Sequence, residues 1–125
     1  MRVLLCCLFL LTACQSPFLV FPGKALDGEI AQTDNFGFAK EHLLLKLETR
    51  PENPYSVFLR VSIIDSKLYV DAAPHRKWHQ FIKENEHVKV QIGKFVYEAK
   101  AVLVDNKALI ANFLPGRSVY QIIPI

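Results

Sequence analysis

Hydrophobic and polar residues alternate along most of the chain from position 43 onward. A period of two places successive side chains on opposite faces of a strand, so this alternation is typical of half-buried β-strands. Turn-forming residues separate the alternating runs, as in mostly β proteins. The predicted strands cover residues 43–49, 56–64, 67–71, 88–92 and 95–104, with an early strand at 28–32 and further candidates at 109–113 and 118–123.

Three short stretches predict how these strands are connected. Residues 50–54 contain two prolines, which end the first run because proline cannot donate to a sheet. The pair Asp65-Ser66 makes a two-residue turn, which predicts a hairpin. The pair Gly93-Lys94 suits a type II′ hairpin between the next two strands.

One segment breaks the strand pattern. Trp78, Phe81 and Ile82 lie at i, i+3 and i+4, on one face of a helix, and a proline just before them fits a first helical turn. This predicts a short helix over about residues 75–84, with Asn85 as a left-handed terminator.

The element count favours a closed sheet. About seven short strands are too many for a flat open sheet of this size, and closure removes exposed edges. The predicted fold class is therefore mainly β, a β-barrel with one short helix. That helix plugs or flanks the barrel, with Trp78 and Phe81 in the core.

The first 13 residues have a different character, because 11 of them are hydrophobic. Arg2 supplies a short positive region, and residues 3–11 are an unbroken apolar run. Nine residues make about 14 Å of helix, too short for a hydrocarbon core of roughly 30 Å. The segment therefore predicts an export signal that is removed.

The signal closes on Leu11-Thr12-Ala13-Cys14, which resembles the bacterial lipoprotein box. The resemblance implies cleavage after Ala13, a diacylglycerol thioether on Cys14 and an added acyl chain such as palmitate. In the sorting rule of enteric bacteria, Gln15 in place of Asp implies the outer membrane, with the protein facing the periplasm. Cys14 is the one cysteine that processing leaves, so the mature chain has no internal disulfide.

The rest of the chain predicts one small domain. Residues 1–13 are the expected signal peptide, 14–25 a lipidated tether and 26–125 the folded domain. The chain has 125 residues, 22% of them charged, and a net charge of +3. This lacks the basic field of a nucleic-acid reader, so no nucleic-acid partner is expected.

Residues 43–104 resemble the flavin-binding split-barrel superfamily, especially its deazaflavin-dependent, nitroreductase-like branch. The order is a strand, a short loop, a helix with basic residues and a Trp, and then a run N-x-x-V-x-V-x-I-G that starts at Asn85 and leads into a hairpin. The resemblance implies that Arg60, Arg76 and Lys77 hold the phosphate of a flavin such as flavin mononucleotide, with Trp78 beside it. Ala72 and Ala73 stand where relatives often have Ser or Thr hydroxyls.

The charged pair Arg76-Lys77 has an independent physical interpretation. Cations are unfavourable at a helix N-terminus unless an anion lies between them and the helix dipole. The pair therefore indicates either an anion site or two side chains that simply extend into water.

Other chemistry has little support in the sequence. His75 and His79 have the i, i+4 spacing of helical metal ligands but no third ligand nearby, so no metal is predicted. No Gly-x-Ser-x-Gly motif is present, and no catalytic residue is predicted.

Three functional hypotheses follow. The first is a non-enzymatic binding or structural module of the envelope, built on a split-barrel scaffold without a cofactor. The alternative is a flavin-binding oxidoreductase that uses Arg60, Arg76, Lys77 and Trp78. The third is a lipoprotein that binds an envelope protein partner through a strand edge.

The lipid anchor gives the first testable prediction. Replacing Cys14 by Ser removes the thiol that would accept the lipid, so Cys14→Ser should accumulate as unprocessed precursor without fatty-acid label. Metabolic labelling with a fatty-acid analogue, followed by gel analysis, measures both effects. Unchanged labelling of the variant would exclude Cys14 as the anchor.

Overall fold

A computed structural model describes residues 23–42 and 44–125. The predicted signal, Cys14 and Gln15, and the first residue of the strand expected at 43, lie outside these residues. The described part begins inside the tether predicted for residues 14–25.

Eight strands and three short helices make up the described chain. The 3₁₀-helix is named η2. In chain order the elements are β1 (Glu29–Ile30), η2 (Gly37–Glu41), β2 (Leu44–Thr49), β3 (Tyr55–Arg60), β4 (Ser62–Ile64), β5 (Lys67–Ala72), α1 (Lys77–Glu84), β6 (His87–Ile92), β7 (Phe95–Leu103), α2 (Lys107–Ile110) and β8 (Ser118–Pro124). None of these helices is long and apolar enough to cross a membrane. The mainly β class predicted from the sequence is confirmed.

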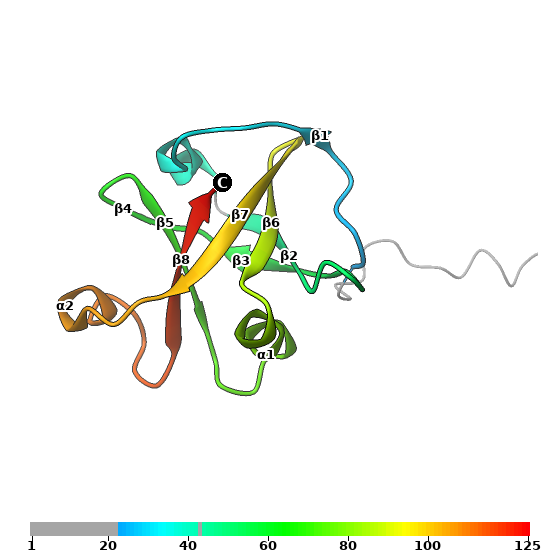
Figure 1. Ribbon diagram of the computed structural model, residues 1–125. Helices are drawn as coiled ribbons and strands as arrows, with labels where there is room; N and C mark the ends of the chain where they lie inside the picture. Colours follow the sequence, from blue (N-terminus) through cyan, green and yellow to red (C-terminus); the bar gives the residue numbers. More distant parts are fainter. Residues whose placement is uncertain (1–22, 43) are drawn as a thin grey trace, which may run out of the picture.

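The strands form one curled sheet with the order β3-β2-β6-β7-β8-β5-β4 (Figure 1). Neighbours along this path are antiparallel, as in the pairing of Leu47 with Val90 between β2 and β6. Strand β7 is long enough to serve two partners on one side: β1 pairs in parallel with its start, and β8 pairs antiparallel with its second half.

The predicted strand over residues 56–64 is two strands. β3 pairs with β2, whereas β4 pairs with β5, at the other end of the strand order. Only Val61 separates the two, so the chain passes from one edge of the sheet to the other across one residue. A flat sheet does not permit this connection, and the sheet must therefore curl until its edges meet.

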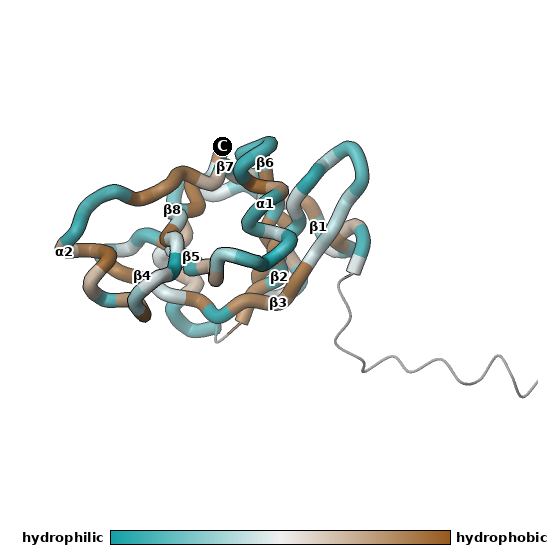
Figure 2. Tube along the Cα trace, turned by 90° about the horizontal axis from the view of Figure 1, so that it is seen from below, coloured by the Kyte–Doolittle hydropathy of each residue, from teal (hydrophilic) through white to brown (hydrophobic). Residues whose placement is uncertain are grey.

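The core fills the inside of this curl. Alternate residues of the central strands are buried, as the sequence period predicts; Leu45, Leu47, Val88, Val90 and Ile92 are each at most 2% exposed. In Figure 2, hydrophobic segments accordingly follow the strands, whereas hydrophilic segments lie over α1.

The hairpin turns agree with the sequence prediction. Asp65 and Ser66 both have positive φ, which a two-residue type I′ turn requires. Gly93 has φ +63°, a conformation that favours glycine, and it begins the turn between β6 and β7.

Two local predictions are wrong. The strand expected at 109–113 is replaced by the short helix α2, because the Asn106 side chain accepts a hydrogen bond from the backbone N–H of Leu109 and caps a helical turn. Asn85 is not left-handed: its φ is −151°, so the chain leaves α1 in an extended conformation and enters β6 directly.

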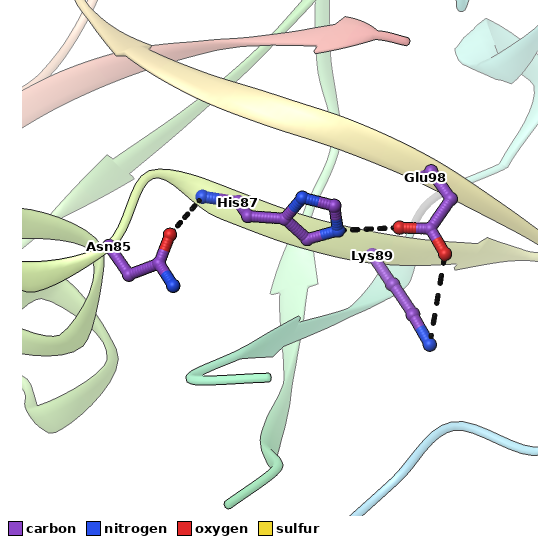
Figure 3. Close-up of polar contacts among 4 residues, drawn as sticks. All are labelled: Asn85, His87, Lys89 and Glu98. Atoms are coloured by element: carbon purple, nitrogen blue, oxygen red, sulfur yellow. Dashed lines mark hydrogen bonds and ion pairs between the residues drawn. The ribbon is translucent and has the colours of Figure 1, made fainter. Parts of the chain in front are cut away.

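The hairpin of β6 and β7 carries a polar cluster on its outer surface (Figure 3). His87 Nε2 lies 2.6 Å from Glu98 Oε1, and Lys89 Nζ lies 3.8 Å from the other oxygen of Glu98. The Asn85 side chain accepts a hydrogen bond from the backbone N–H of His87. These half-exposed contacts fix the start of β6 and the register of the hairpin.

Helix α1 covers one end of the barrel through a mixed face. Trp78 and Ile82 are buried in the core, each 4% exposed, as expected for a plug. Phe81 is only half-buried, which corrects its predicted place in the core. Its ring packs edge-on against Tyr55 at 5.2 Å, under the guanidinium of Arg50 at 4.0 Å.

A buried polar pair completes the contact of α1 with the sheet. The His79 ring Nδ1 lies 3.0 Å from the hydroxyl of Tyr120 on β8, and both residues are buried. Burial, with Lys83 nearby, lowers the pKa of His79 below 6.5, and burial also raises the pKa of Tyr120. Protonation of His79 is therefore disfavoured in the folded protein.

Stability should consequently decrease in mild acid. Below pH 6.5 the unfolded chain binds a proton at His79 more readily than the folded chain does. The contribution of His79 to the free energy of unfolding is therefore fully present above this pH and is lost as the pH falls. Urea unfolding at about pH 7.5 and about pH 5.5 measures the change. His79→Gln should flatten the dependence and exposed His75→Gln should not; equal slopes in all three proteins would contradict this.

Candidate functional site

A cleft of about 870 Å³ opens beside α1. Its walls come from the segment before β1, from β3, from the loop between β5 and α1, and from the residues before β8. The lining residues are Gly23, Ala25, Leu26, Asp27, Lys46, Tyr55, Ser56, Val57, Phe58, Leu59, Arg60, Asp71, His75, Arg76, Lys77, Trp78, Leu114 and Arg117.

The cleft brings together all four residues that the sequence proposed for a cofactor. Arg60 ends β3 at the junction that closes the barrel, and its side chain is exposed. Arg76 and Lys77 begin α1 and are also exposed, while Trp78, one position later, turns into the core and still borders the cleft. Arg60 thus shares one site with three residues that lie 16 to 18 positions later in the sequence.

The charge of the molecule is concentrated here. Five Lys and Arg residues and two Asp residues line the cleft, a surplus of three positive charges. The whole chain has 15 basic and 12 acidic residues, also a surplus of three. One of the 15 is Arg2, outside the described residues; the other nine basic and ten acidic residues outside the cleft nearly balance, so the surplus of positive charge lies in the cleft.

Most of these cations have no acidic partner within the described residues. The exception is Arg117, which is paired with Asp71: its guanidinium donates to the Asp71 carboxylate and, at 3.1 Å, to the Asp71 backbone carbonyl. Lys46 lies over the ring of Phe58, with Nζ 5.1 Å from the ring centroid. No ion pair formed in the described part of the chain involves Lys46, Arg60, Arg76 or Lys77.

The N-terminus of α1 adds a further source of positive potential. Arg76 is the N-cap residue, but no side chain hydrogen-bonds to the first turn, and that turn has no acidic residue. The first backbone N–H groups and the helix dipole therefore favour an anion next to Arg76 and Lys77. The geometry is compatible with the anion site, and both side chains are also exposed, as the second interpretation of this pair expects.

The chain before β1 forms one wall of the cleft and is firmly attached. Gly23 and Ser56 exchange two backbone hydrogen bonds of 2.9 Å. The N–H of Leu26 donates to Glu48 Oε1 at 2.8 Å, and Glu48 is only 3% exposed. At Gly28 a Cβ atom would meet the carbonyl oxygen of Lys94 at 2.7 Å, so the close approach needs glycine.

Sequence reasoning missed four charged members of the site: Asp27, Lys46, Asp71 and Arg117. Lys46 interrupts a run of leucines, the one local sign that this position faces something other than the core. Arg117 follows a glycine and is brought to the cleft by the pairing of β8 with β5, which no local pattern reveals.

The alanines that depart from the family pattern lie outside the cleft lining. Ala72 is fully buried, and the Ala73 carbonyl accepts the N–H of Arg76 at 3.2 Å. These two positions therefore supply no hydroxyl group to the cleft, and the charged donors to an anion are the cations of the lining.

The two histidines considered for metal binding have different surroundings. His75 borders the cleft, whereas His79 is bonded to Tyr120 in the interior. Across residues 23–42 and 44–125, no three His, Cys, Asp or Glu side chains gather as a metal site.

Comparisons with known proteins bear on the fold. No protein-family model matches the chain, and no curated protein matches it in sequence. Solved structures do match: a protein from Listeria innocua named for pyridoxamine 5′-phosphate oxidase (TM-score 0.61, 16% identity) covers 69% of this chain and 86% of its own. The fold is a split β-barrel.

Two further similar structures are of split-barrel proteins whose names mention a ligand. The heme storage protein HutZ from Vibrio cholerae matches with a TM-score of 0.55 at 13% identity, over 70% of this chain and 85% of its own. An FAD-binding protein from Mesorhizobium loti matches with a TM-score of 0.53 at 16% identity, over 70% of this chain and 84% of its own. At these identities the likeness concerns the fold alone.

The Asp71–Arg117 pair leads to a prediction on anion affinity. Asp71→Asn removes a negative charge from the cleft and releases Arg117, so the affinity for inorganic phosphate should rise about fivefold, the effect of roughly 1 kcal/mol of Coulomb energy. Calorimetric titration measures this. Asp105→Asn, at an exposed residue outside the cleft, is the matched control; equal affinities in the two variants would show that Asp71 does not oppose the anion.

Proposed function

We propose that this chain is an outer-membrane lipoprotein, anchored at Cys14 and facing the periplasm, whose split barrel binds a phosphate-bearing, flavin-type ligand in the basic cleft. The carrying observation is the convergence of Arg60, Arg76, Lys77 and Arg117 on one cleft beside an uncapped helix N-terminus. The proposal is one of binding and assigns no catalytic residue.

The basic end of the cleft suits a phosphate group. Arginine offers paired donors that match phosphate geometry, and hydrogen bonds to charged groups are stronger than neutral ones. Arg60 and Lys77 have no competing carboxylate among the ion pairs of the described chain. They are thus available to a ligand without first breaking an internal pair.

The remaining lining suits a planar ring system. Tyr55, Val57, Leu59 and Trp78 supply aromatic and aliphatic surface in the same cleft. A volume of about 870 Å³ falls within the range of small-molecule sites. Apolar walls with a few convergent charges are the usual composition of a cofactor site.

Ligands named for the similar structures support this choice. FAD carries phosphates and heme carries carboxylates on planar aromatic rings, and both are held by proteins of this fold. Flavin mononucleotide has the same combination in a smaller molecule, which makes it the first ligand to test. An envelope protein partner bound through a strand edge stays a prediction from the sequence.

Flavin binding is measured with the protein's single tryptophan. Trp78 borders the cleft, so bound flavin mononucleotide should quench its fluorescence and remain after desalting. Arg60→Gln and Lys77→Gln should each weaken binding about 10- to 100-fold, the effect of losing a charged hydrogen bond. Lys107→Gln, on α2 outside the cleft, should bind normally.

Riboflavin, which lacks the phosphate, distinguishes the two parts of the proposal. It should bind more weakly than flavin mononucleotide, and it should not respond to the Arg60 and Lys77 substitutions. Equal binding of the two flavins would refute the phosphate site, and failure of both to bind would leave the cofactor-free envelope module.

A further inference from the structure

The attached segment at residues 23–27 fixes where the protein meets its membrane anchor. Gly23, Ala25, Leu26 and Asp27 line the cleft, and Gly23 is held to Ser56 on β3. Whatever precedes Gly23 in the chain therefore joins the domain at the wall of the cleft and not at the far side of the barrel.

The distance from this wall to the anchor is short. Nine residue steps separate Cys14 from Gly23, and an extended chain spans at most about 3.6 Å per step, or roughly 32 Å. A domain of this size has a radius of gyration of about 13 Å, so its far side is almost as distant from Gly23 as the tether is long. With Cys14 in a lipid layer, the side held closest to that layer is the one that carries the cleft.

The lining of the cleft has the composition of a surface that contacts lipid. Phe58 is 55% exposed and Leu114 is 67% exposed, although both are large and hydrophobic. They border the same cleft as Lys46 and Arg76. Exposed apolar side chains next to basic ones are typical of proteins that lie on an anionic membrane, because each cation adds attraction to the headgroups.

We propose that the cleft side of the barrel docks on an anionic phospholipid surface, with Phe58 and Leu114 at the interface and Lys46 and Arg76 against lipid phosphates. The inference rests on the proposed anchor at Cys14, since the tether sets the orientation. Its consequence is that the cleft opens toward the bilayer, so that its ligand enters at the membrane surface.

Two probe positions test this orientation. Leu114 lies in the loop before β8 and Ile125 directly follows β8, so a seven-residue strand of about 23 Å lies between the two in the chain. Both are highly exposed, at 67% and 63%, and in Figure 1 the C-terminus lies at the opposite end of β8 from the loop that carries Leu114. Lipidation blocks Cys14, so Leu114→Cys or Ile125→Cys supplies the one free thiol of the mature chain for a fluorescent dye.

The measurement uses the lipidated protein in vesicles that contain a spin-labelled quencher lipid. In phosphatidylglycerol vesicles, the dye at 114 should be quenched severalfold more than the dye at 125. In phosphatidylcholine vesicles, or at high salt, quenching at 114 should fall because the electrostatic attraction is lost, and the difference that remains is the part set by the tether alone. Adding Arg76→Gln to the 114 variant should lower the ratio of docked to undocked protein about fivefold, as expected for the loss of one cation near the surface.

Each of the other possible quenching results excludes one part of the docking proposal. Equal quenching at 114 and 125 in phosphatidylglycerol excludes the orientation, and equal quenching at 114 in both lipids excludes the anionic partner. The intact mass of the same preparation shows whether Cys14 carries lipid, so a missing anchor is distinguished from an anchored protein that fails to dock. Flavin titration in solution is independent of all three results.

Discussion

The single-residue link at Val61 is the constraint on which the rest of the structure depends. It joins β3 and β4, the two ends of the sheet order, so the sheet can satisfy both pairings only by closing. Closure buries the alternate apolar residues of the central strands and removes most exposed edges at once. It also leaves Arg60 at a corner, exposed, next to the site where the other cations gather.

The cleft is a product of this closure and of two further attachments. α1 is held by Trp78 and Ile82 inside and by the Arg50–Phe81–Tyr55 stack outside, and its uncapped N-terminus lines the same cleft as Arg60. The segment before β1 is held by the buried carboxylate of Glu48. One wall of this basic cleft is continuous with the chain that precedes Gly23, so an anchor at Cys14, as proposed, would place ligand binding next to the anchored end of the domain.

The sequence predicted most of the strands because burial on one face imposes a period of two. β2, β5, β6 and β7 agree with the expected ranges to within a residue or so. Prediction failed where a local interaction outweighed the pattern: Asn106 caps a helix in an apolar stretch, and the break at Val61 lies inside an unbroken alternation. Only some of the charged residues of the cleft could be predicted from the sequence. Arg60, Arg76 and Lys77 came from a resemblance, whereas Lys46, Asp71 and Arg117 join them only through strand pairing that is invisible in local sequence.

The pairing of β1 with β7 has a consequence for the order in which the molecule assembles. Glu29 pairs with Phe95, and Gly28 packs against the Lys94 carbonyl, so β1, which directly follows the segment that walls the cleft, waits for a partner that is made some 66 residues later. Contacts of such long sequence separation form late, because a large loop must close first. In a chain that crosses a membrane from its N-terminus, the tether would emerge early, while the binding site would be assembled only after nearly the whole polypeptide had followed it.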